Sequence, residues 1–139
     1  MATLWAKTVT FESVRVGDRL PILVKWETAE TMKRTNAQAS PTAGNQEVDE
    51  QELSLHPAAL VSYVTELLEK AFPVSSIAAQ GSSIQVESLA TVRPEDTISL
   101  SGKVTAKHEE DHLRLVECEI IVEAEDGKTM ARGVAVVSL

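Results

Sequence analysis

Residues 57–72 read PAALVSYVTELLEKAF, the clearest helical pattern in the chain. Leu60, Val64 and Leu67 recur every three or four residues, as apolar side chains do on the buried face of a helix. Pro57 suits the first helical turn, where its missing N–H has no bond to lose. Because apolar residues occupy most of the circumference, this helix is predicted to be largely buried.

The part of the chain that follows has the period of β-strands. Apolar and polar residues alternate in four segments: 82–89, 98–106, 113–124 and 129–139. Turn signals separate them, among them a charged turn predicted at Lys107–Asp111 and a hairpin turn at Asp126-Gly127. An antiparallel sheet with one polar face needs cover on its other face, and the helix is the large apolar element available. The sequence therefore predicts an α+β fold, an antiparallel β-sheet wrapped around one long central helix at 57–72.

The part of the chain before the helix is less regular. A β-rich run at 20–26 leads into a short helix predicted at 29–38. Residues 39–54 are small, polar and acidic, so we expect a loop there. A loop of this length within a small domain is usually functional or mobile.

Length and charge exclude several classes of protein. With 139 residues, the chain (1–139) is predicted to be a single domain. A formal net charge of −8 argues against nucleic acid and against an anionic membrane surface as partners. No apolar run is long enough to span a membrane, and the first residues lack the apolar stretch of a signal peptide, so we expect a cytoplasmic protein.

Three short strings carry a resemblance to a known family. FESVRVGD at 11–18, VRPEDTI at 92–98 and EDGK at 125–128 stand in the order and spacing of similar strings in MaoC-like acyl dehydratases and (R)-specific enoyl-CoA hydratases. The chain resembles that family over residues 11–28 and 55–139. In the second string Glu95 stands where the family usually has glycine.

The resemblance implies the hotdog fold and a role with acyl thioesters. A coenzyme A (CoA) thioester would be the substrate or ligand, and no cofactor or metal would be needed. The family resemblance also implies a dimer, formed either with a second copy or with a related hotdog chain.

The sequence departs from the family at the catalytic motif. The family carries Gly-Asp-x-Asn-Pro-x-His after the first short helix, and its Asp and His activate a water. Here residues 38–45 read QASPTAGN, with neither Asp nor His. A histidine does precede the central helix, within Leu55-His56-Pro57, where family members often have Ala-His-Gly.

Four residues are candidates for a rearranged site. His56 and Asp49 are the candidate catalytic pair that would replace the missing motif. Asn45 and Arg93 are candidate substrate-binding residues, with Arg93 suited to a phosphate of CoA. Each has a plainer interpretation as a helix cap (His56), a solvated loop residue (Asp49 and Asn45) or a surface cation (Arg93).

Other chemistry-bearing residues have mainly structural interpretations. His108 and His112 flank acidic residues in the predicted charged turn, where their side chains need not converge on a metal. Cys118, the one cysteine of the chain, falls on the apolar face of a strand and is expected to be a buried thiol.

Three functions remain open at this stage. The first is a hydratase or dehydratase with a rearranged or degenerate site. The second is a non-catalytic hotdog subunit or thioester-binding module, which the missing motif favours. The third is an acyl-CoA thioesterase, which would need a carboxylate on the central helix, for which Glu66 or Glu69 is available.

Overall fold

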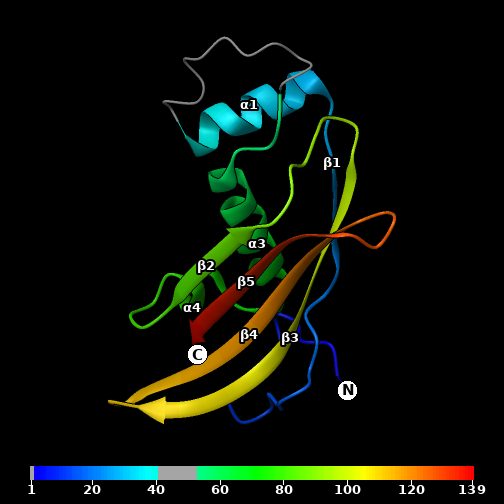
Figure 1. Cartoon of the computed structure of the whole chain (residues 1–139). Coiled ribbons are helices and arrows are strands. Elements are labelled where there is room, and N and C mark those ends of the chain that lie inside the picture. Colours follow the sequence, from blue (N-terminus) through cyan, green and yellow to red (C-terminus); the bar gives the residue numbers. More distant parts are fainter. Residues whose placement is uncertain (1, 41–52) are drawn as a thin grey trace.

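The computed structural model describes residues 2–40 and 53–139. Figure 1 shows a curved sheet with helix α3 lying along its inner face and helix α1 across the end where α3 begins. The elements follow in the order β1 (Leu23–Trp26), α1 (Ala29–Ala39), α3 (Pro57–Ala71), α4 (Val74–Ile77), β2 (Ser83–Ser88), β3 (Thr97–Glu110), β4 (Leu113–Ala124) and β5 (Thr129–Ser138). The predicted α+β architecture is therefore confirmed.

The sheet has five strands in the order β1-β3-β4-β5-β2. All neighbouring strands are antiparallel. The two edges of the sheet are thus formed by β1, which precedes the helices in the chain, and by β2, which follows them.

The central helix is buried as its sequence pattern predicts. Pro57 occupies the first turn, and seven of the helix's fifteen residues are buried: Ala59, Leu60, Tyr63, Val64, Leu67, Leu68 and Ala71. Burying a leucine of this kind contributes about 2 kcal/mol. The helix ends at Ala71, one residue earlier than predicted, because Phe72 takes an extended conformation as its C-cap. The Phe72 side chain is fully buried in the core.

Cys118 lies at the centre of this core. Its Cα pairs with Val104 on one side and with Ala135 on the other, and its side chain has no exposed surface. Burial, followed by the charge of Glu117, raises the pKa of the Cys118 thiol to about 12. The thiol therefore stays protonated and unreactive at neutral pH, which confirms the expectation of a buried structural cysteine.

The turn between β3 and β4 is tighter than the sequence suggested. A charged turn at Lys107–Asp111 was expected, but β3 continues to Glu110, whose Cα pairs with Leu113. Only Asp111 and His112 form the turn, with φ angles of +49° and +68°. Two residues with positive φ match the twist of the flanking strands, which lets the long strands pair to their tips.

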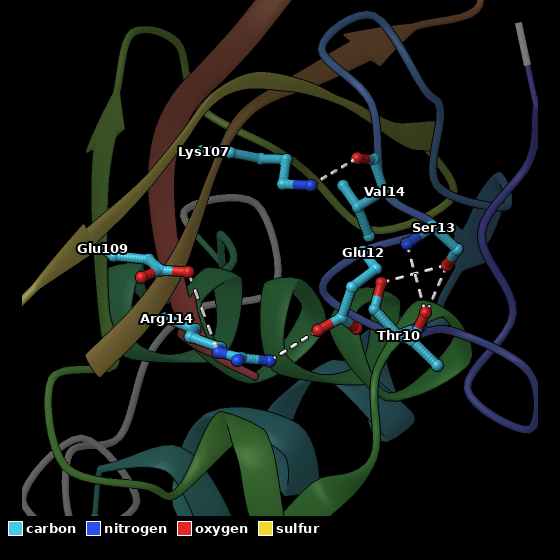
Figure 2. A network of polar contacts seen from close by, with 7 residues as sticks. All are labelled: Thr10, Glu12, Ser13, Val14, Lys107, Glu109 and Arg114. Atoms are coloured by element: carbon cyan, nitrogen blue, oxygen red, sulfur yellow. Dashed lines mark hydrogen bonds and ion pairs between the residues drawn. The ribbon is translucent and has the colours of Figure 1, made fainter. Parts of the chain in front are cut away.

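The N-terminal segment is fastened to that hairpin by charged side chains, as Figure 2 shows. The Lys107 Nζ donates to the carbonyl oxygen of Val14 over 2.8 Å, and it also lies 4.4 Å from the centre of the Phe11 ring. On the same side, Arg114 forms an ion pair of 2.6 Å with Glu12. The contact with Val14 gives the Lys107 side chain a partner while its backbone pairs with Val116, so the strand continues past the start of the expected turn.

The turn before β3 carries the Glu95 substitution noted in the sequence. Glu95 has a φ of +73°, which is the left-handed conformation that glycine adopts without strain. Its backbone N–H donates to the carbonyl oxygen of Glu27 over 2.8 Å, so the turn is tied to the end of β1. Glu95 thus adopts the conformation that glycine usually takes in a turn.

We predict that Glu95→Gly stabilises the protein. Relief of left-handed strain is worth about 1–2 kcal/mol, and the added freedom of the unfolded chain costs about 0.4–1 kcal/mol. The free energy of unfolding should therefore rise by about 0.5–1 kcal/mol, measured by urea denaturation. Glu95→Ala is the control, since it removes the carboxylate but keeps the strain. Equal stabilisation by both variants would show that charge, not conformation, is responsible.

The predicted loop at 39–54 falls mostly on residues 41–52, which lie outside the described residues. Within the described ranges, no helix combines the length and apolar character needed to cross a membrane.

Candidate functional site

His56 is the N-cap residue of α3. Its backbone is extended, with φ −67° and ψ 141°, and its Nδ1 accepts a hydrogen bond of 3.1 Å from the N–H of Ala58. A side-chain acceptor at this position satisfies one of the free N–H groups at the start of a helix. The capping interpretation of His56 is therefore correct, and the ring is only partly exposed.

A buried asparagine on α1 holds the chain that leads into this cap. The Nδ2 of Asn36 donates to the carbonyl oxygen of Ser54 over 2.9 Å, and its Oδ1 accepts from the backbone N–H of His56 over 2.8 Å. Only 8% of Asn36 is exposed. The oxygen and the nitrogen of one side-chain amide thus both bind the backbone of residues 54–56 and hold it in place.

The same three residues are held from the opposite side by the segment that leads into β3. The N–H of Leu55 donates to the carbonyl oxygen of Val92 over 2.8 Å. His56 follows Leu55 and Arg93 follows Val92, so this bond places two of the four candidate site residues on neighbouring stretches of backbone. Arg93 is exposed, and its backbone N–H donates to Oδ2 of Asp96 over 2.9 Å.

The other two candidates, Asp49 and Asn45, lie outside the described residues. The structure therefore brings together the neighbourhoods of His56 and Arg93 only. The sequence analysis missed Asn36, although there was a signal for it: Asn36 lies four residues after the buried Met32, on the apolar side of its helix.

A second polar cluster lies where β1, α1 and α3 meet. The Glu27 carboxylate accepts hydrogen bonds from the hydroxyls of Thr35 and Tyr63. Beside them the Lys25 Nζ lies 2.6 Å from a carboxylate oxygen of Glu66 and 5.0 Å from the centre of the Tyr63 ring. A buried tyrosine hydroxyl needs a hydrogen-bond partner. The place of Tyr63 in a largely apolar helix could therefore have predicted a polar residue beside it.

This cluster joins three elements and has little room for a ligand. The cavity lined by Lys25, Glu27 and Tyr63 has a volume of about 10 Å³, which is room for a single water. Both carboxylate oxygens of Glu27 are already occupied by hydroxyl donors. We therefore interpret the cluster as a structural contact that holds β1 against the helices α1 and α3.

The carboxylates that a thioesterase would need have other surroundings. Glu66 is paired with Lys25, and its side chain is 45% exposed. Glu69 is exposed on the solvent face of α3. Neither environment resembles the enclosed position expected of a catalytic carboxylate.

Both histidines of the hairpin are exposed: His112 lies in the turn, and His108 lies in β3 with its Nε2 3.9 Å from Glu110. Across residues 2–40 and 53–139, no group of three or more His, Cys, Asp or Glu side chains is arranged to hold a metal ion.

The sheet wrapped around α3 is the hotdog fold, as solved structures with the same arrangement show. A MaoC-like dehydratase from Rhodospirillum rubrum has a TM-score of 0.70 and 18% identity, covering 95% of this chain and 97% of that one. An (R)-hydratase from A. caviae involved in PHA biosynthesis has a TM-score of 0.66 and 18% identity, with coverage of 92% and 98%. The ChsH1–ChsH2 complex from Mycobacterium tuberculosis includes a chain with a TM-score of 0.67 and 17% identity, with coverage of 91% and 98%.

Comparison with protein-family models finds no match for this sequence. Comparison with curated proteins finds none either. At identities this low, the structural likeness shows the fold alone, and it confirms the predicted hotdog fold and the similarity of that fold to MaoC-like dehydratases and (R)-hydratases.

We predict that Tyr63 resists ionisation in the folded protein. Burial first, and then the hydrogen bond to Glu27, raise the pKa of Tyr63 well above its ordinary value of 10. Because Tyr63 is the only tyrosine in the chain, tyrosinate absorbance near 295 nm reports on it alone. Native protein should show no tyrosinate signal at pH 10–11, whereas urea-unfolded protein should titrate near pH 10.

The same shift makes stability depend on alkaline pH. A group whose pKa is raised by folding stabilises the folded protein fully at any pH below its pKa in the unfolded chain. That contribution is lost as the pH rises towards its pKa in the folded protein. The free energy of unfolding should thus fall above pH 10, with Tyr63 contributing up to about 1.4 kcal/mol per pH unit. The fall should be shallower in Tyr63→Phe. An identical slope in both proteins would contradict the assignment.

Proposed function

We propose that this chain acts on or binds acyl-CoA thioesters, with a hydratase- or dehydratase-like activity at a rearranged site. The observation that carries the proposal is the placement of His56 at the start of the central helix of a hotdog fold. The structural likeness to a MaoC-like dehydratase and an (R)-hydratase supports the same reaction class.

Hydration of an enoyl thioester needs a group that takes a proton from water and a group that stabilises charge on the thioester oxygen. Water adds to the enoyl double bond, its oxygen to the β-carbon and a proton to the α-carbon, while charge develops on the thioester oxygen. Hydrogen-bond donors at the start of a helix stabilise that charge. We propose that His56 contacts the thioester group, where the reaction takes place, and that Arg93 binds a phosphate of CoA. Asp49 and Asn45 remain proposals for the base and for substrate binding.

A non-catalytic subunit is the second candidate function. The specific observation in its favour is the segment QASPTAGN at 38–45, which lacks the Asp and His of the family motif. Such a subunit would support a related hotdog chain, and a complex named for two different chains is among the structural neighbours. A thioesterase is the weaker alternative, because Glu66 is paired with Lys25 and Glu69 faces solvent.

We further propose that a second hotdog chain, identical or related, pairs with the edge of β2. The other edge, β1, has four residues, follows Pro21 and points Lys25 inwards, which are all features that discourage strand addition. β2 has six residues, SIQVES, with neither proline nor lysine. A free edge of this kind is stabilised by pairing with another strand.

The activity is tested by mass spectrometry. Purified protein is incubated with a panel of enoyl-CoA and saturated acyl-CoA esters. We expect enoyl esters to gain the mass of one water, at a rate reduced at least 100-fold in His56→Ala if His56 supplies a transition-state donor. Release of free CoA would instead identify a thioesterase. Absence of turnover from the whole panel would favour the non-catalytic subunit.

The proposed edge is tested by substitution at Val86. The register in which Leu89 donates to Met130 directs the N–H groups of Ile84 and Val86 away from β5, towards the free edge. Val86→Pro therefore removes an edge donor without breaking a bond to β5, and Val86→Ala is the matched control that loses the side chain but keeps the N–H. We expect the proline variant alone to raise the dimer dissociation constant at least tenfold in analytical ultracentrifugation. A wild-type monomer would point to a different hotdog chain as partner, and equal association of both variants would place the interface elsewhere.

A further inference from the structure

The hydrogen bond that caps α3 also decides which nitrogen of His56 carries a proton. The N–H of Ala58 points at Nδ1 over 3.1 Å, and only a nitrogen with a free lone pair can accept it. A neutral imidazole has one protonated nitrogen, so the proton lies on Nε2. In this state the free end of the ring is a donor.

Asn36 keeps the ring in that position. Its amide binds the carbonyl oxygen of Ser54 and the N–H of His56, over 2.9 and 2.8 Å, so the backbone on which the ring is mounted is held on both sides of Leu55. Leu55 itself is buried and bonded to Val92. With its backbone fixed by three hydrogen bonds and its Nδ1 by a fourth, His56 has little freedom to turn its ring over.

We propose that Asn36 is a positioning residue that holds His56 in the Nε2–H tautomer, so that His56 presents a hydrogen-bond donor to a thioester oxygen and is not a base. The tautomer follows from the hydrogen bond between Ala58 and Nδ1 alone. That a thioester oxygen accepts the bond from Nε2 rests on the function proposed above. To act as a base at Nε2, the ring would have to move its proton to Nδ1 and so break the cap of α3. The group that takes the proton of the attacking water must therefore be another residue.

The tautomer is read directly by NMR. Long-range ¹H–¹⁵N correlation spectra of labelled protein distinguish protonated from unprotonated ring nitrogens, and the signals of His56 are identified by their loss in His56→Asn. At pH 8 we expect a protonated Nε2 and an unprotonated Nδ1. A protonated Nδ1, or averaged shifts at both nitrogens, would overturn the proposal.

Asn36→Leu tests the positioning role. It removes both amide hydrogen bonds at similar volume, and Gln38→Leu, at an exposed position on the same helix, is the control. We expect the His56 shifts to move towards the tautomer average in Asn36→Leu and to stay unchanged in Gln38→Leu. A loss of stability with unchanged ring shifts would make Asn36 merely structural.

Two substitutions at His56 separate a donor from a base. Glutamine reaches the position of Nε2 with an amide N–H, but it cannot take up a proton; asparagine can cap the helix but is too short to reach that position. If His56 is a donor, His56→Gln should keep enoyl-CoA hydration within about tenfold of wild type, while His56→Asn falls at least 100-fold. If glutamine is as inactive as asparagine, the donor role is wrong.

Failure of the proposed function gives a different result. A wild-type protein that turns over no thioester, and whose His56 Nε2–H signal does not shift when hexanoyl-CoA is added, would overturn the thioester as the acceptor. The tautomer and the effect of Asn36→Leu on it would still be decided by the spectra.

Discussion

Burial of α3 against the inner face of the sheet is the interaction on which the other features depend. The helix contributes seven side chains to the core, and β3, β4 and β5 contribute buried residues to the same hydrophobic cluster. A helix buried along its length can meet polar partners only at its ends and along its one open face. The polar groups of interest accordingly gather at the first turn, around His56, and beside Tyr63.

The polar groups around His56 and beside Tyr63 both supply hydrogen-bond partners that α3 would otherwise lack. At the start of α3 the free N–H groups need acceptors, and a histidine side chain supplies one while Asn36 fixes the backbone before it. About two turns later, a tyrosine hydroxyl that would otherwise be buried without a partner is bound by the carboxylate of Glu27. The first arrangement uses Asn36 of α1, and the second uses Glu27, the residue after β1, so the short elements before the helix orient it in addition to covering it.

The sequence predicted the fold well because period and turn chemistry are local. The pattern of 57–72 predicted the helix, β4 was placed at its observed bounds 113–124, and the Asp126-Gly127 turn has the expected positive φ at Gly127. The error at Lys107 came from a long-range contact, since a residue 93 positions away in the chain holds that lysine in the strand. Local patterns carry no trace of such a partner.

The candidate site was predictable only in part, for the same reason. His56 could be identified from its place before Pro57, and its capping role follows from that place. The contributions of Asn36 and Glu27 depend on residues 20 and 36 positions further along the chain, and only the folded sheet and helices bring them together. The resemblance to a family helped with the fold but not with the site, since the motif that would have named the catalytic pair is replaced by QASPTAGN.

The attachment of the N-terminal segment to the β3–β4 hairpin has a consequence for how the molecule opens. The segment is held by Lys107 over the Phe11 ring and by the pair of Arg114 and Glu12, whose side chains are 50% and 69% exposed. Exposed ion pairs weaken as salt is added, whereas the burial of α3 does not. Added salt should therefore loosen the exposed contact between Glu12 and Arg114 first, whereas the buried Val14 side chain and the backbone bond from Gly17 to Val104 keep the segment attached to β3.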